Sequence, residues 1–174
     1  MGTKINTEVV LFTTAATLLI LGVATAGLTT TIFAQQNPNT FTAILSGSNE
    51  VPPVTTAGSG IAIFQLSSVG HQLIINYQLN LINISGVTGA YIHNGKQGEN
   101  GPVIASLFNP SMRGPPTGAI NGQLKAATLT SSDLTGPLAG NQITDLVNMI
   151  RSGGAHVNVH TTQNQNGEVR GQIS

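Results

Sequence analysis

The chain has 174 residues, in which 6 Lys and Arg balance 6 Asp and Glu, so its formal net charge is zero. A neutral chain has no net field to attract a polyanion, which argues against nucleic-acid binding. Charged residues make up only 7% of the sequence, far below the roughly 25% of ordinary soluble domains. There is no cysteine, so the fold depends on a hydrophobic core and not on disulfides.

The N-terminal segment has the features of an export signal. Lys4 precedes an uncharged, mostly apolar run from Val9 to Ala26. The small residues around Ala34, before Gln35, are typical of a cleavage site, and Ala24–Ala26 is a second candidate. Extended to Phe33, the run also reaches the roughly 20 residues that a membrane-spanning helix needs. The sequence therefore predicts a hydrophobic helix that is either a cleaved signal peptide or a retained anchor.

These features predict three regions: residues 1–34 as signal peptide or anchor, 35–40 as a linker, and 41–174 as the folded domain. We expect the protein to be extracytoplasmic, secreted or held at the cell membrane, with membrane contact only through its N-terminal segment.

After Thr40 the sequence changes to short segments in which apolar and polar residues alternate, the pattern of half-buried strands. In the clearest one, Leu73–Leu81, every second residue is apolar. Gly, Pro and Asn separate the segments and indicate turns. The expected strands are Phe41–Leu45, Ile61–Leu66, Leu73–Leu81, Thr88–His93, Val103–Phe108, Gly118–Leu129, Ala155–Thr161 and Glu168–Ile173.

One soluble helix is expected at Asn141–Ser152, where apolar residues recur at helical spacing. Asn141 is a candidate cap and Gly153 and Gly154 a stop signal. Together the elements predict an all-β fold: an antiparallel β-sandwich or Greek-key-like barrel of about seven or eight strands with one packed helix.

Four motifs in the second half of the chain resemble the CHRD domain family, named after its occurrence in chordin. They are Tyr91–Gly95, Gly98–Val103, Val157–Thr161 and Gly167–Ile173. Asn49–Val54, which includes Glu50, Pro52 and Pro53, fits the same pattern. The resemblance covers about residues 41–173 and implies an all-β extracellular or exported module without an established biochemical activity.

Three histidines carry the most specific chemistry. His156 and His160 share a strand face with Asn158, but positions i and i+4 lie about 13 Å apart, too far to bind one ion. A single site would need a bulge, a strand twist or a histidine from a neighbouring strand placed between them, and His93 is the candidate for the last. The family usually has His where this chain has Tyr91, and an aromatic residue where it has His156. This exchange implies that positions 91 and 156 lie side by side.

A cluster of His93, His156 and His160 suits Cu(II) or Zn(II), because both metals bind neutral imidazole. Tyr91, Asn158 and Glu99 are candidate supporting residues, and Glu50 is a second loop carboxylate that can complete a shell. The alternative is a hydrogen-bonded polar cluster without an ion. A histidine-bearing strand followed by a Gly-rich loop is locally similar to copper-zinc superoxide dismutase. This chain lacks that enzyme's full ligand set, which argues against dismutase activity.

Other motif residues have structural interpretations. Gly95, Gly98 and Gly101, spaced by three, indicate tight turns, and no helix follows them as a phosphate loop requires. Glu168 and Arg170, followed by Gly171, share a strand face. Because charges are rare in this chain, we expect Arg170 to be partly buried and bonded to a carboxylate or to loop carbonyls.

No nucleophile elbow or pair of catalytic carboxylates is present, so the expected function is a binding or structural module and not an enzyme. Its partner would be an unidentified protein or surface. The alternative is a copper- or zinc-binding metalloprotein.

Overall fold

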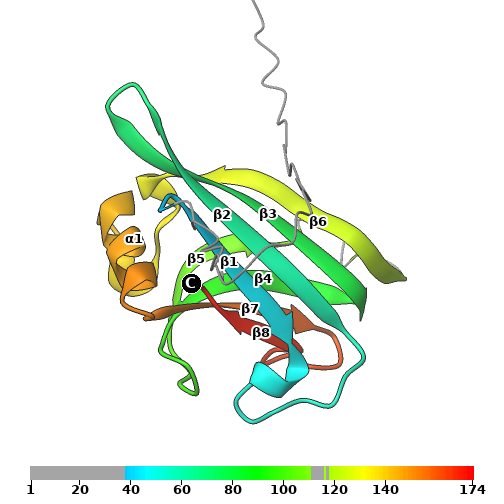
Figure 1. Ribbon diagram of the computed structural model, residues 1–174. Coiled ribbons are helices and arrows are strands. Elements are labelled where there is room, and N and C mark those ends of the chain that lie inside the picture. Colours follow the sequence, from blue (N-terminus) through cyan, green and yellow to red (C-terminus); the bar gives the residue numbers. More distant parts are fainter. Residues whose placement is uncertain (1–37, 111–115, 117) are drawn as a thin grey trace, which may run out of the picture. The chain divides into compact units, whose positions relative to one another are not determined.

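A computed structural model describes residues 38–110, 116 and 118–174, and within them the chain folds as antiparallel strands with one α-helix (Figure 1). The predicted signal or anchor segment, residues 1–34, and most of the linker lie outside this part. No helix among the described residues is long and apolar enough to cross a membrane. The strands are β1 (Thr40–Ser46), β2 (Ser59–Val69), β3 (Gln72–Ser85), β4 (Val87–Asn94), β5 (Val103–Phe108), β6 (Ala119–Leu129), β7 (Ala155–Thr161) and β8 (Val169–Gln172), and the helix is α1 (Ile143–Arg151).

The strands form one sheet in the order β5-β4-β7-β8-β1-β2-β3-β6. The sheet curls until the segment after β6 meets β5, where Leu134 bridges Ala105 and the Thr135 N–H donates to the Ile104 carbonyl at 2.8 Å. The Tyr77 hydroxyl on β3 also donates to the Leu107 carbonyl on β5. The result is a nearly closed, barrel-like sheet, which confirms the predicted fold class.

The core lies on the concave side of the sheet and follows from the alternation of the sequence. On β3, Ile75, Tyr77, Leu79 and Leu81 are buried, and the residues between them face outward. Burying one such aliphatic side chain contributes about 1.5–3 kcal/mol. The apolar side of α1 adds to this core with Ile143, Leu146, Val147 and Ile150.

The N-cap of the helix lies one residue later than predicted. Gln142, and not Asn141, is the N-cap residue, and its backbone N–H donates to Asp145 Oδ2 at 2.9 Å. The side chain of Asn141 instead donates to the Pro137 carbonyl. Gly153 ends the helix with a φ of +69°, as its position predicted.

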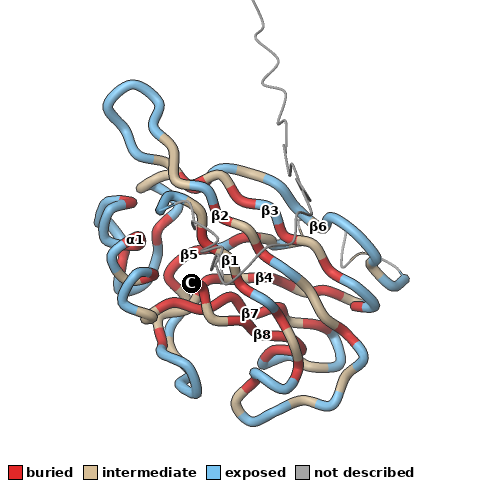
Figure 2. Tube along the Cα trace, viewed as in Figure 1, coloured by how far each residue is buried: buried red, intermediate tan, exposed pale blue. Residues whose placement is uncertain are grey.

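Burial differs between the two ends of the sheet (Figure 2). All but one of the residues of β7 are buried, whereas β2 and β6 expose much of their outer face. Two loops account for the difference: the first loop, residues 47–58, and the second loop, residues 95–102. Asn100 of the second loop donates to the Val51 carbonyl of the first at 2.8 Å, so the two loops are joined.

Candidate functional site: a polar face beneath two loops

Three neighbouring strands place their polar residues on the outer face of the sheet. His93 of β4 is paired with His156 of β7, and Asn158 of β7 lies between Tyr91 of β4 and Arg170 of β8. Since alternate residues share a face, these side chains lie together. We call this the polar face and define it as Tyr91, His93, His156, Asn158, His160, Arg170 and Gln172.

The register corrects one expectation. Positions 91 and 156 are not directly opposed, because Tyr91 faces Asn158 and His156 faces His93. The exchange of Tyr and His relative to the family is therefore between diagonal neighbours.

The three histidine rings form a row with His93 in the middle. The ring centroids of His93 and His156 lie 5.3 Å apart, and those of His93 and His160 lie 5.9 Å apart. Both pairs are stacked, with interplanar angles of 12° and 21°. Tyr91 closes the row with its ring edge-on to His160 at 5.3 Å. His93 thus occupies the gap between His156 and His160 that a regular strand leaves open.

Backbone carbonyls determine which nitrogen of two of these rings carries the proton. His93 Nδ1 lies 2.7 Å from the Gly101 carbonyl, and a carbonyl can only accept, so Nδ1 donates. His160 bonds the Gln165 carbonyl, and its Nε2 has no partner, so it too donates through Nδ1. Both rings therefore keep a free lone pair on a buried Nε2. Burial lowers the pKa of both, which favours this neutral form.

His156 is the most strongly perturbed of the three. Burial lowers its pKa to about 4, and the positive charge of Arg170 acts in the same direction. Its Nδ1 lies 3.2 Å from the Gly95 carbonyl and 3.3 Å from Arg170 Nη2. His156 is 1% exposed and remains neutral at physiological pH.

Arg170 fixes the second loop to the sheet. Its side chain is 2% exposed, Nη2 donates to the carbonyls of Lys96 and Glu99 at 3.0 and 2.6 Å, and Nη1 donates to Asn100 Oδ1 at 3.0 Å. The expectation of a buried arginine bonded to loop carbonyls is confirmed. The Arg170 carbonyl also accepts from Asn49 of the first loop at 3.1 Å, so one residue contacts both loops.

Glu50 of the first loop reaches the polar face. It is 5% exposed, and its Oε2 accepts from Asn158 Nδ2 at 3.3 Å. Burial raises the pKa of Glu50 to about 7, although Arg170 and Asn158 partly oppose the shift. Gly167 lies against both side chains: with a φ of +130°, a Cβ there would lie 2.6 Å from Glu50 Oε1 and would also overlap Asn158. Only glycine fits at this position.

The remaining predicted residues have structural positions. The Glu99 carboxylate is exposed and accepts from the Lys96 N–H at 3.2 Å, so it does not reach the polar face. Glu168 accepts from the hydroxyls of Thr56 and Thr161 at 2.7 and 2.8 Å and does not pair with Arg170.

The motif glycines lie where the backbone has a positive φ or where another backbone segment approaches too closely for a side chain. Gly98 has a φ of +82°, and a Cβ on Gly95 would lie 2.8 Å from the Glu99 carbonyl oxygen. Side chains at Gly101 and Gly171 would overlap the Asn94 and Ile44 carbonyls. Pro52 and Pro53 lie in the first loop.

Sequence reasoning did not assign roles to Asn49, Asn100 or Thr56. All three are polar loop residues that bond residues distant in the sequence, and their side-chain chemistry alone does not distinguish them from solvated ones. The only signal was that Asn49 and Asn100 lie within motifs shared with the family.

Five buried polar atoms in the described part of the chain have no hydrogen-bond partner, and all belong to the polar face or to Glu50: Glu50 Oε1, His93 Nε2, Asn158 Oδ1, His160 Nε2 and Gln172 Oε1. With Glu50 ionised, all five are acceptors. A cavity of about 260 Å³ between the two loops is lined by Glu50, Gly98, Arg170 and Gln172, and so by two of the five residues that carry these atoms. No group of three or more His, Cys, Asp or Glu residues within the described ranges is arranged to hold a metal ion.

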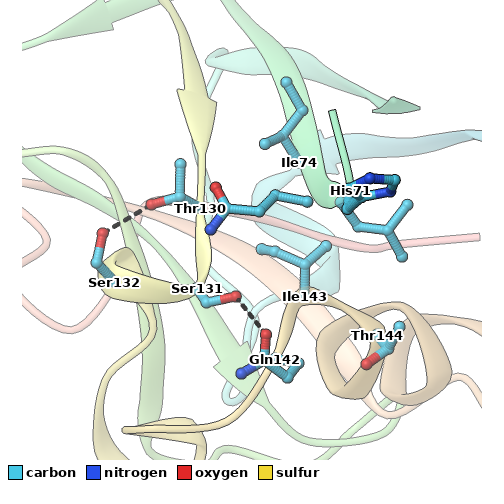
Figure 3. A pocket seen from close by; sticks show the side chains of 10 residues that line it. His71, Ile74, Thr130, Ser131, Ser132, Gln142, Ile143 and Thr144 are labelled. Carbon is cyan, nitrogen blue, oxygen red and sulfur yellow. Dashed lines mark hydrogen bonds between the residues drawn. The ribbon is translucent and has the colours of Figure 1, made fainter. Parts of the chain in front are cut away.

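A larger hollow, of about 660 Å³, lies elsewhere, between the start of β3, the segment after β6 and the start of α1 (Figure 3). Its polar groups bond one another: Thr130 pairs with Ser132, and Ser131 donates to Gln142. His71 lies exposed at its rim. The hollow contains none of the unpaired atoms, so the polar face is the stronger candidate site.

A curled antiparallel sheet with a polar face closed by two loops defines an all-β binding or structural module. The family model of the CHRD domain matches residues 41–173, and the chain belongs to the CHRD domain family. CHRD domains occur in extracellular or secreted proteins, which agrees with the expected location outside the cytoplasm. Neither the curated proteins nor the solved structures contain a match to this chain.

Proposed function

We propose that this protein is an exported, non-enzymatic binding module whose ligand site is the polar face beneath the two loops. The observation that carries the proposal is the group of five buried polar atoms without partners, four of which are acceptors whatever the protonation state of Glu50. Leaving one buried polar atom unpaired costs about 1–3 kcal/mol. Several unpaired polar atoms in one place are therefore expected where a bound partner supplies the missing hydrogen bonds or metal contacts. Because the unpaired atoms accept, the partner is a cation or a group rich in hydrogen-bond donors.

A transition-metal ion is the second candidate, and a specific observation favours it. The Nε2 lone pairs of His93 and His160 are free, while each Nδ1 is oriented by a backbone carbonyl. This is the arrangement by which outer contacts orient histidine ligands. Copper is the first choice and zinc the second, because imidazole suits both. His156 is a weaker ligand candidate, since the adjacent Arg170 charge opposes a cation there.

The donor chemistry thus fits such an ion, but the number of protein ligands is small. Structural zinc sites normally have four, and here two imidazoles have free nitrogen atoms. Tyr91, Asn158 or water would have to complete the coordination. The metal candidate therefore predicts a site with open positions.

The test is a titration of the domain from Gln35 onward with Cu(II) and with Zn(II), monitored by melting temperature and by elemental analysis after dialysis. An ion present at about 100 times its Kd stabilises the fold by about 2.7 kcal/mol. The His93→Ala, His160→Ala double variant should lose this stabilisation. His71→Ala is the matched control, because it removes an exposed imidazole far from the polar face, and it should retain the effect.

Two results would separate the candidates. An unchanged melting temperature with no retained ion excludes the metal and leaves a donor-rich partner, to be identified with the wild type and the double variant as paired baits. Equal ion binding by the His93→Ala, His160→Ala double variant and by the His71→Ala control would show that the polar face is not the metal site. The mass of the mature N-terminus tests export: a start at Gln35 indicates a cleaved signal, and an intact segment in the membrane fraction indicates an anchor.

A further inference from the structure

Asn83 has a backbone conformation that sets it apart in the described part of the chain. It lies at a bulge of β3, where the register with β6 shifts between Ile82 and Ile84, and its φ is +55°. No other non-glycine residue among those described has a positive φ. Its N–H donates to Asn121 Oδ1 at 2.9 Å. Asn and Gly are the residues that tolerate this conformation, so the bulge explains the backbone at this position.

The bulge does not explain why Asn83 and Ser85 have exposed polar side chains. Ile84 is fully buried, whereas Asn83 and Ser85 on either side of it are exposed. Neither the Asn83 amide nor the Ser85 hydroxyl has a hydrogen-bond partner within the described ranges, although both are polar groups next to a buried residue. Glycine would meet the need for a positive φ with less strain than asparagine. The amide and the hydroxyl are therefore available for a role outside the fold.

We propose that Asn83 is an N-glycosylation site. Asn83-Ile84-Ser85 is an Asn-x-Ser triplet, the acceptor pattern for glycan transfer when x is not proline. The other Asn-x-Ser or Asn-x-Thr triplet in the sequence, Asn109-Pro110-Ser111, has the excluded proline. The bulge exposes the acceptor amide, and buried Ile84 holds the triplet at a fixed place on the sheet.

The reaction is a transfer from a lipid-linked diphosphate sugar, catalysed by an oligosaccharyltransferase outside the cytoplasm. A bond forms between Asn83 Nδ2 and the anomeric carbon of the sugar, and the bond from that carbon to the diphosphate oxygen breaks. The lipid diphosphate leaves, and the amide loses one proton to the enzyme. The inference rests on the export part of the proposed function, because the donor and the transferase act on exported chains.

The surroundings of Asn83 give the glycan a physical role. The outer face of β1, β2 and β3 exposes three isoleucines: Ile44 at 72%, Ile61 at 37% and Ile82 at 59%. Ile44 and Ile61 are directly paired, and Ile82 precedes Asn83. Exposed apolar patches are sites of association. A glycan on Asn83 would shield this patch in a domain that has few charges to keep it soluble.

The experiment is peptide mapping by mass spectrometry of the protein purified from its native source, with the N-terminus read in the same data. The expected result is a mature or anchored chain whose Asn83 peptide carries a hexose-containing mass increment, with fragmentation placing it on Asn83. Ser85→Ala and Asn83→Gly should abolish the increment, and Ser85→Thr should retain it. Asn83→Gly is the folding control, because glycine tolerates the positive φ and should preserve the melting temperature of the unglycosylated domain.

An unmodified Asn83 peptide overturns the inference. If that chain is nevertheless processed at Gln35 or found in the membrane fraction, export stands and only glycosylation fails. If the chain is neither processed nor found outside the cytoplasm, export fails as well. An increment that persists in Ser85→Ala would show modification by another chemistry and would also overturn the assignment.

Discussion

The two parts of the sheet differ in the polarity of their outer faces and in how far loops cover them. On β4, β7 and β8 the outer face is polar, yet loops cover much of it, and Arg170 is 2% exposed. On β1, β2 and β3 no loop of the described residues covers the outer face, yet isoleucines lie on it, with Ile44 72% exposed. Solvent exposure alone would favour the reverse distribution. This contrast supports the two proposals: a donor-rich ligand or ion beneath the loops, and a covering group over the isoleucines.

The largest expected effect tests whether Arg170 holds the covered face together. Arg170→Met keeps much of the side-chain volume but leaves the carbonyls of Lys96 and Glu99 without their donor. Removing one partner of such a buried charged network costs about 3–5 kcal/mol, measured by urea unfolding. Lys125→Met is the matched control on the open side, because Lys125 is an exposed cation on β6, and it should change stability by less than about 0.5 kcal/mol. Equal losses in the two variants would contradict the comparison.

The second prediction concerns the pH dependence that Glu50 confers. Its pKa rises from 4.5 to about 7 on folding, so the folded state holds a proton that the unfolded state releases. The contribution of Glu50 to stability is therefore complete below pH 4.5 and is lost as the pH rises through 7. The shift corresponds to about 3 kcal/mol. Glu50→Gln, which is neutral at every pH, should equal the wild type near pH 4.5 and be more stable by up to about 3 kcal/mol above pH 7.

The difference between the two unfolding curves is the informative quantity, because the histidines titrate in both proteins and cancel. A difference that stays constant between pH 4.5 and 8 would show that folding does not raise the pKa of Glu50.

The smallest effect is expected on the open face. Ile44→Thr should change the free energy of unfolding by less than about 0.5 kcal/mol, because Ile44 is 72% exposed. Val159→Thr on β7 is the contrasting variant: Val159 is fully buried, and a buried hydroxyl without a partner costs about 1–3 kcal/mol. A large loss in Ile44→Thr, measured by thermal unfolding, would mean that the outer isoleucines are covered in the isolated domain.

Alternation in the sequence was sufficient to predict the strands and the side chains that share a face. Val157 and Val159 face the core while His156 and His160 face outward, as the period of two requires. The register between strands was not predictable in the same way. A shift of two residues keeps every side chain on its face, so the pattern did not distinguish Tyr91 from His93 as the partner of His156.

The contributions of the loops were the least predictable part of the site. Glu50 and Asn158 are separated by 108 residues, and nothing local in either segment indicates that they meet. Glu99 and Glu50 are both loop carboxylates in family motifs, yet one is exposed and the other buried. Arg170 was predictable in its burial because charges are rare, but its carbonyl partners depend on the path of the second loop.

The position of β8 has a consequence for the order of assembly. β8 has only four residues and lies between β7 and β1, so it joins a half that contains β4, β5 and β7 to a half that contains β1, β2, β3 and β6. It also supplies Arg170, which is synthesised 70 residues after Asn100 and 121 residues after Asn49. During translation both loops emerge long before the strand that fixes them. The polar face is thus the last part of the domain to be completed, and a ligand bound there as proposed would distinguish finished molecules from partly folded ones.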